Sequence, residues 1–287
     1  MVVSVWTAFI ALLAIGGWRA RSAVAESRGL DKLVALCPTF FAMPLAVFGA
    51  EHLAGDKGIM ELVPAYMPWR PFWFYFVGVA LVAAALSIAT GVLVRWSGFL
   101  FGVMMFLFVA MLHFPGALSD PHERIGWVIV FRETSFGAGG WSLSGSATPG
   151  WRPKAANALV TIGRVLVALA AIFFAIQHFL HPINVPGVPL AKELPATIPG
   201  RAVVGYLTGA VLLIGGVGIL VGRKTRTMAT CTGAWIVLLV LFIYGPLLID
   251  SMRDPSVAAK VQGVNYFADT LLFAGAILAV ARAAPRD

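Results

Sequence analysis

Apolar segments long enough to cross a lipid bilayer recur along the whole sequence. A transmembrane helix needs about 20 consecutive, predominantly apolar residues. The chain contains nine candidate segments: 2–18, 33–54, 72–94, 97–116, 124–146, 156–180, 202–222, 228–249 and 263–283. The sequence therefore predicts an all-α polytopic membrane protein with nine helices.

The composition agrees with this class. Hydrophobic residues make up 60% of the chain and charged residues only 12%, whereas a soluble domain carries roughly 25% charged residues. The net charge of +8 is carried mostly by Lys and Arg in short loops, where they orient helices. We therefore expect the lipid bilayer as the partner and no nucleic acid, and a soluble enzyme is excluded. Cys37 and Cys231 lie far apart in apolar segments, which excludes a disulfide framework.

The distribution of Lys and Arg predicts the orientation of the helices. One set of alternate loops carries twelve of these residues and the other carries seven. Loops rich in positive charge stay in the cytoplasm. We therefore expect the N-terminus outside and the C-terminus inside, in the cytoplasmic (inner) membrane of a bacterium or archaeon. A cleaved signal peptide is the alternative for residues 1–18, but Arg19 and Arg21 follow the apolar run and no basic residue precedes it.

An internal repeat divides the chain. The segment PAYMPWR at 64–70 is matched by PATIPGR at 195–201, an offset of 131 residues. The same offset pairs glycines, arginines and prolines over some fifty residues: Gly78 with Gly209, Gly91 with Gly222, Arg95 with Arg226, and Pro115 with Pro246. Such regular self-similarity is the signature of a repeated structural unit.

The offset changes in two of the predicted outward loops. Upstream it is 126, which pairs Glu51-His52 with Gln177-His178, and downstream it is 136, which pairs Arg132-Glu133 with Ala268-Asp269. We predict two tandem four-helix bundles of the same orientation, related by an axis along the membrane normal, after one N-terminal transmembrane helix. The expected divisions are an N-terminal helix and basic loop (1–32), a first unit (33–150) and a second unit (151–287).

Each unit contains the same ordered set of short motifs. A helix ends in a histidine motif (Ala50-Glu51-His52-Leu53; Ile176-Gln177-His178-Phe179), a Pro-Ala-x-x-Pro loop follows, then a Gly-rich helix with a basic turn, and a third helix ending in x-Pro. This set resembles the DoxX/DoxD family of small membrane proteins, over about residues 35–145 and 157–283. The resemblance implies a membrane subunit of a redox complex with other subunits as partners, such as the quinone-reactive part of a thiosulfate:quinone oxidoreductase. It supplies no family-wide catalytic residue.

Polar side chains within the apolar segments are costly and are therefore functional candidates. In the first half these are Glu51, His52, His113, Arg132 and Glu133, and in the second half they are Gln177, His178, Tyr244 and Asp269. Nearly all lie toward the outward side. Adjacent helical residues point about 100° apart, so Arg132 is not expected to pair with Glu133 and could instead meet Glu51. The glycines of 137–140 should allow close helix approach.

These residues suggest a quinone site near the outer leaflet. A histidine can hold a quinone oxygen, and a nearby carboxylate can accept a proton. The proposed catalytic residues are Glu51, His52, His113 and Glu133. The proposed cofactor-binding residues are His52, His113, Arg132, His178, Tyr244 and Asp269; no metal site is expected. The first half retains more ionisable groups, so it is the better candidate for the active half.

Three other functions are alternatives to a quinone site. Haem b could be ligated by His52 with His113, or by His178, but these residues lie at helix ends rather than a turn inside the bilayer. A non-catalytic anchor or assembly subunit is the main alternative, because the loops are too short for a catalytic domain. A transporter is disfavoured because the polar residues stop on one side of the membrane. No nucleotide-binding loop, zinc-protease motif or nucleophile elbow is present.

Overall fold

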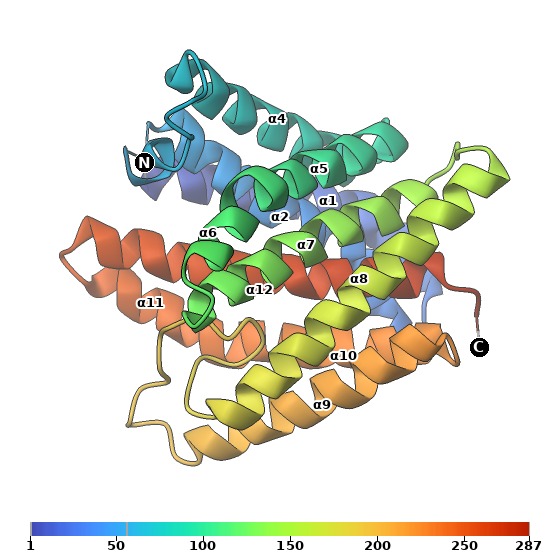
Figure 1. Ribbon diagram of the computed structural model, residues 1–287. Coiled ribbons are helices and arrows are strands. Elements are labelled where there is room, and N and C mark those ends of the chain that lie inside the picture. The colour runs from blue at the N-terminus through green and yellow to red at the C-terminus, as the bar shows by residue number, and fades with distance from the viewer. Residues whose placement is uncertain (1, 56, 287) are drawn as a thin grey trace.

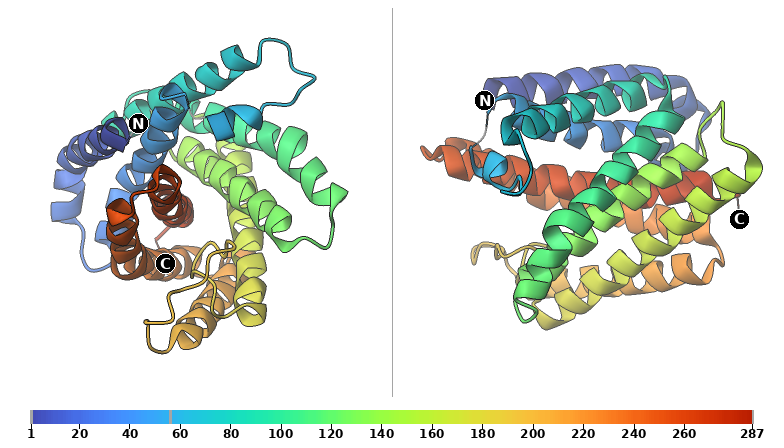
Figure 2. Two further views of the ribbon diagram at one scale, coloured as in Figure 1. Left: turned by 90° about the vertical axis from the view of Figure 1, so that its left-hand side faces the viewer. Right: turned by 45° about the horizontal axis from the view of Figure 1, so that its top comes forward.

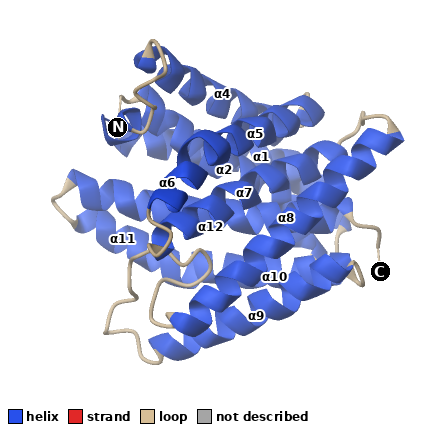
Figure 3. Ribbon diagram, in the orientation of Figure 1, coloured by secondary structure: helices blue, strands red, loops and turns tan. Residues whose placement is uncertain are grey.

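The computed structural model describes residues 2–55 and 57–286, and this part of the chain is helical without any β-strand (Figures 1 and 3). The described residues include eight helical stretches that are long and apolar enough to cross a membrane. The chain is therefore a multi-pass all-α membrane protein, as predicted. The helices run between two ends of the molecule, and the first and last described residues lie at opposite ends (Figures 1 and 2).

The first half contains seven α-helices and one π-helical segment within the described residues. Their bounds are α1 (Val2–Glu26), α2 (Asp31–Leu53), α3 (Lys57–Glu61), α4 (Arg70–Thr90), α5 (Val94–Phe108), η1 (Val109–His113), α6 (Phe114–Ser119) and α7 (Arg124–Gly145). The second half continues with α8 (Pro153–Leu180), α9 (Arg201–Val221), α10 (Thr225–Leu239), η2 (Val240–Tyr244), α11 (Gly245–Arg253) and α12 (Val257–Ala283).

The first helix is longer than the sequence predicts. We expected it to end near residue 18 and to be followed by a basic loop, but α1 continues to Glu26 and includes Arg19 and Arg21. Arginine, alanine and glutamate are strong helix formers, and no glycine or proline occurs between Arg19 and Arg28. The link to α2 is therefore only the four residues 27–30.

One of the nine predicted spans, α7, is not among the eight apolar ones. The helix itself is confirmed, but Arg132, Glu133 and a tail rich in glycine and serine reduce its hydropathy. It packs against α5, α8 and α12 and runs between the same two ends as they do (Figure 1). Most of its residues from Glu133 to Ser144 are buried, so protein rather than lipid surrounds its polar half.

Glycines let α7 approach its neighbours closely. A Cβ atom added at Gly98 of α5 would lie 2.6 Å from the carbonyl oxygen of Gly140 on α7, and one added at Gly140 would lie 2.9 Å from the oxygen of Gly98. A Cβ on Gly139 would lie 2.5 Å from Cβ of Ala276 on α12. The close approach expected for the glycines of 137–140 is therefore confirmed at these positions.

The helix bounds recur at the 131-residue offset found in the sequence. The start and end of α4 match those of α9 at this spacing, and the same holds for α5 with α10 and for η1 with η2. The left-handed residues Trp69 and Leu93 likewise correspond to Gly200 and Lys224. Neighbours also recur: α2 packs on α4 as α8 packs on α9, and α7 contacts α8 as α12 contacts α2.

Each π-helical segment lies just before a proline. The N–H of Phe114 donates to the carbonyl of Val109, and that of Gly245 donates to Val240, so both bonds span five residues. Pro115 and Pro246 have no N–H to continue the α-helical ladder, and the chain widens there by one residue. His113 and Tyr244 end the two widened turns.

Candidate functional site

A cavity of about 590 Å³ lies among α2, α4, α5, η1, α7 and α12. Its lining is mostly aromatic, aliphatic and methionine side chains, including Phe101, Met104, Met105 and Phe108. The polar lining includes six residues singled out from the sequence: Glu51, His52, His113, Arg132, Glu133 and Asp269. The four proposed catalytic residues therefore share one cavity.

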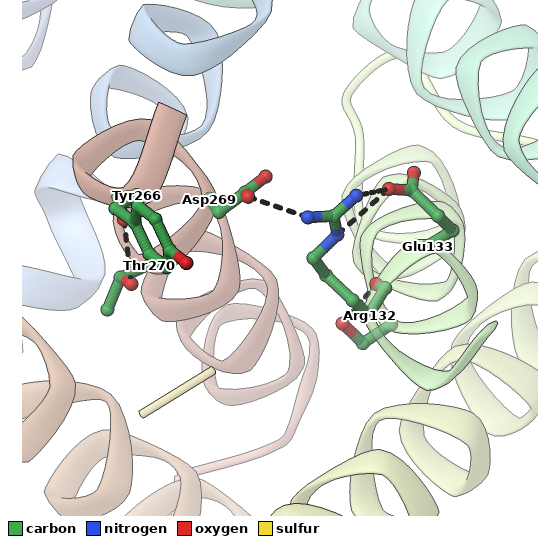
Figure 4. A network of polar contacts seen from close by, with 6 residues as sticks. Arg132, Glu133, Tyr266, Asp269 and Thr270 are labelled. Carbon is green, nitrogen blue, oxygen red and sulfur yellow. Dashed lines mark hydrogen bonds and ion pairs between the residues drawn. The ribbon is translucent and has the colours of Figure 1, made fainter. Parts of the chain in front are cut away.

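Arg132 lies between two carboxylates (Figure 4). Its Nη1 is 2.7 Å from Oδ2 of Asp269, and its Nε and Nη2 are 2.9 and 2.6 Å from Oε1 of Glu133. The expectation that Arg132 does not pair with Glu133 is wrong, because the long side chain and planar guanidinium reach around the helix to the neighbouring carboxylate. Its cross-helix ion pair joins α12 and not Glu51. We call Arg132, Glu133 and Asp269 the charged triad.

The charged triad is largely shielded from solvent. Side-chain exposure is 17% for Arg132, 10% for Glu133 and 7% for Asp269. Ions removed from water lose several kcal/mol of hydration each, which only good geometry and hydrogen bonds repay. With both acids ionised, the triad would carry one negative charge in excess. Such a group can accept a proton from a neighbouring molecule.

Glu51 forms a second link between α2 and α12. The carboxylate is buried, with 1% exposure. The amide nitrogen of Asn265, turned toward it, donates to Oε1 and Oε2 at 2.9 Å each. Asn265 was not identified from the sequence. A usable signal exists, because it precedes Asp269 by four residues and so lies on the same face of an apolar helix.

The two histidines at the cavity are partly buried. Nδ1 of His52 donates to the carbonyl of Phe48 at 2.7 Å, and its ring stacks on Phe74 with centroids 5.0 Å apart. These contacts fix the orientation of the ring. His113 lies at the end of η1, where the widened turn carries its side chain to the cavity.

His178 and Tyr244, also proposed to bind a cofactor, lie elsewhere. Both are buried, with 0% and 1% exposure. Nε2 of His178 accepts a hydrogen bond from the N–H of Gly187 at 3.0 Å, and the hydroxyl of Tyr244 donates to the carbonyl of Pro186 at 2.7 Å. The structure therefore places these two side chains against the chain's own α8–α9 loop. Asp269, in contrast, joins the first-half residues.

A second, more open cavity adjoins the first on the other side of the charged triad. It has a volume of about 600 Å³ and is lined by the start of α12, including Gln262 and Tyr266. Arg132, Asn265 and Asp269 line both cavities. These polar side chains therefore separate the apolar cavity from the open one.

No known protein-family model matches the chain, and no curated protein or solved structure is significantly similar to it. Among the described residues, no group of three or more histidine, cysteine or acidic side chains is placed to hold a metal ion. The lining of the cavity is therefore the indication of its chemistry.

Proposed function

We propose that this protein binds a quinone in the apolar cavity and is the quinone-reactive membrane subunit of a redox complex. The observation that carries the proposal is the cavity itself, which is apolar along most of its lining and has two histidines and the charged triad among its polar groups. Its volume of about 590 Å³ is within the usual range of small-molecule sites, about 300–1,000 Å³. A bound quinone would supply the transfer of electrons together with protons.

The position of the cavity favours a ligand that arrives from the bilayer. Phe76 on α4 and Leu107 on α5 both line it, yet each is 51% exposed. In a multi-pass protein such exposed apolar side chains face lipid, so the cavity borders the lipid surface between these two helices. An apolar tail can then remain in the membrane while the head lies among Phe101, Met105 and Phe108.

The polar side chains at the cavity have distinct roles in this proposal. His113 donates a hydrogen bond to an oxygen of the head. Nδ1 of His52 donates to Phe48, so its Nε2 accepts a hydrogen bond from a quinol hydroxyl. Glu133 accepts a proton, and Arg132 holds its carboxylate in place through two hydrogen bonds. Asp269, on the other side of Arg132, lines the open cavity as well, which gives the proton a short route toward water. General acid–base groups placed in this way accelerate proton transfer by about 10²–10⁴-fold.

We infer two tandem DoxX/DoxD-like four-helix units, preceded by α1 and related by an axis along the membrane normal. The recurrence of helix bounds and left-handed residues at an offset of 131 supports it. The distribution of Lys and Arg supports an outside N-terminus and a cytoplasmic C-terminus in a bacterial or archaeal inner membrane.

Purification from native membranes, followed by a visible spectrum and quinone extraction, tests the function. We expect about one quinone per chain and redox subunits that co-purify with the protein. The quinone should be lost in His113→Ala. The matched control is His181→Ala, because His181 is an exposed histidine at a helix end outside the cavity. A Soret band without quinone would instead indicate haem b. Partner subunits with neither quinone nor haem would indicate the assembly role.

A further inference from the structure

The loop between α8 and α9 is folded into the second half of the protein. Residues 184–189 are all buried, including Val185 and Val188 at 0% and 1% exposure. Loops usually run over the surface, because a buried loop must find partners for its backbone polar groups. A continuous buried segment of six loop residues therefore fills space that would otherwise be open.

One peptide group of this loop is held at both edges. The group joins Pro186 to Gly187: its carbonyl accepts from the Tyr244 hydroxyl at 2.7 Å, and its N–H donates to Nε2 of His178 at 3.0 Å. A Cβ atom added at Gly187 would contact the apolar carbons of Thr270, Ile236 and Leu239 at 3.2–3.8 Å. A flat polar group thus lies between a histidine and a tyrosine, among apolar side chains.

The residues around this peptide group correspond to residues of the first-half cavity. At the offset of 126, His178 corresponds to His52. At the offset of 131, Tyr244 corresponds to His113, Ile236 to Met105 and Leu239 to Phe108. All four of these first-half counterparts line the 590 Å³ cavity.

The length of the two loops accounts for the difference. The offset rises from 126 before the α8–α9 loop to 131 after it, so the second half has five more residues between its histidine motif and α9 than the first half has between its histidine motif and α4. The shorter connection contributes Leu62, Val63, Pro64 and Met67 to the cavity lining. These four residues are exposed or only partly buried, and a cavity remains beneath them.

We propose that the peptide group joining Pro186 to Gly187 is a built-in occupant of the second-half site, and that the first-half cavity binds a ligand of the same form. That ligand is a small planar group with a carbonyl oxygen, held edge-on between His52 and His113. The inference rests on the proposed function insofar as a quinone head belongs to this class. It also assigns a structural role to His178 and Tyr244, which hold the loop.

Single cysteines can test whether the second site is filled. In a Cys37→Ala/Cys231→Ser background, Phe108→Cys and Leu239→Cys are treated with N-phenylmaleimide in phosphatidylcholine vesicles. We expect Phe108→Cys to react at least about tenfold faster. Deletion of residues 185–189, or Tyr244→Phe as a milder change, should raise the reactivity of Leu239→Cys severalfold and leave Phe108→Cys unchanged. Equal reactivity in the intact loop would overturn the proposal. Unchanged reactivity of Leu239→Cys in a folded Tyr244→Phe variant would also overturn it, whether or not the deletion variant folds.

Protection by added probes tests the ligand class separately. N-butylbenzamide and decylubiquinone, both planar and carbonyl-bearing, should slow labelling of Phe108→Cys, whereas hexadecane should not. Protection by hexadecane alone would overturn the ligand class. Protection by N-butylbenzamide without decylubiquinone would retain this inference and reject the quinone function. Protection by decylubiquinone with equal reactivity of the two cysteines would retain the function and reject the plugged site.

Discussion

Arg132 on α7 and Asp269 on α12 are 137 residues apart in the chain, and their side chains meet with Nη1 2.7 Å from Oδ2. Each residue comes from the last helix of one half of the sequence. The ion pair therefore joins the two halves at the edge of the cavity. Glu133 pairs with the same guanidinium. The stability of the protein and the chemistry of the cavity therefore depend on the same three side chains.

Arg132→Gln should strongly destabilise the protein, because it leaves Glu133 and Asp269 facing each other without the cation. Breaking a buried ion pair by removing one partner costs about 3–5 kcal/mol. Unfolding by SDS in mixed micelles measures this free energy. Arg253→Gln is the control: its pair with Asp250 is exposed on both sides, and such pairs contribute about 0–1 kcal/mol. Equal losses in the two variants would show that the triad is not a stabilising unit.

Glu133→Gln and Asp269→Asn should slow decylubiquinol oxidation by comparable amounts, about 100-fold, in membranes that contain the intact complex. The sequence alone places Asp269 in the second half and favours the first half as the active one. In the structure, both acids bind the same guanidinium, so loss of either charge shifts Arg132 toward the other. Asp250→Asn, at an exposed position, should leave the rate unchanged. A wild-type rate in Asp269→Asn would exclude it from the proton path.

Met105→Trp should weaken decylubiquinone binding by at least about tenfold, or about 1.4 kcal/mol. Met105 is buried and lines the cavity, so the larger indole occupies the space proposed for the ligand. Equilibrium dialysis with labelled decylubiquinone in detergent gives the affinity. Leu100→Trp on the same helix is 58% exposed and should bind normally. Unaltered affinity in Met105→Trp would place the ligand outside this cavity.

Gly98→Ala and Gly17→Ala should change stability in opposite directions. A Cβ on Gly98 would lie 2.6 Å from the Gly140 carbonyl, and overpacking of this kind costs about 1–3 kcal/mol. Gly17 has no atom within 4 Å of an added Cβ, so alanine should stabilise α1 by up to about 1 kcal/mol through helix propensity. Melting temperatures in one detergent compare the two. A stabilised Gly98→Ala would mean that α5 and α7 are not in tight contact.

The sequence predicted those parts of the fold that depend on local chemistry. Gly91 and Gly222, which the repeat pairs, end α4 and α9 in the left-handed conformation that glycine favours. The helices expected to end at Pro115 and Pro246 instead continue past these prolines, to Ser119 and Arg253. Glu51, His52 and His113 lie near the ends of their apolar segments, and the structure places them at one cavity with Arg132 and Glu133.

Two features of the site depend on contacts that no local pattern encodes. The charged triad was missed because the positions of neighbouring residues on a helix say nothing of how far an arginine can reach. The burial of residues 184–189 was missed because a short segment rich in proline and glycine has no hydrophobic period. Both are fixed by partners on distant helices: Asp269 for Arg132, and His178 and Tyr244 for the loop.

The polarity of α7 has a consequence for the order in which the protein is built. A charged side chain near the middle of a helix opposes spontaneous entry into lipid by about 2.5–3.5 kcal/mol. Arg132 has one partner beside it in Glu133, but Asp269 leaves the ribosome only 137 residues later. Until then, α7 relies on α5 and α8 for protection from lipid. Late arrival of α12 would therefore act as a checkpoint in biosynthesis, since chains that lack it expose an incompletely neutralised helix to membrane quality control.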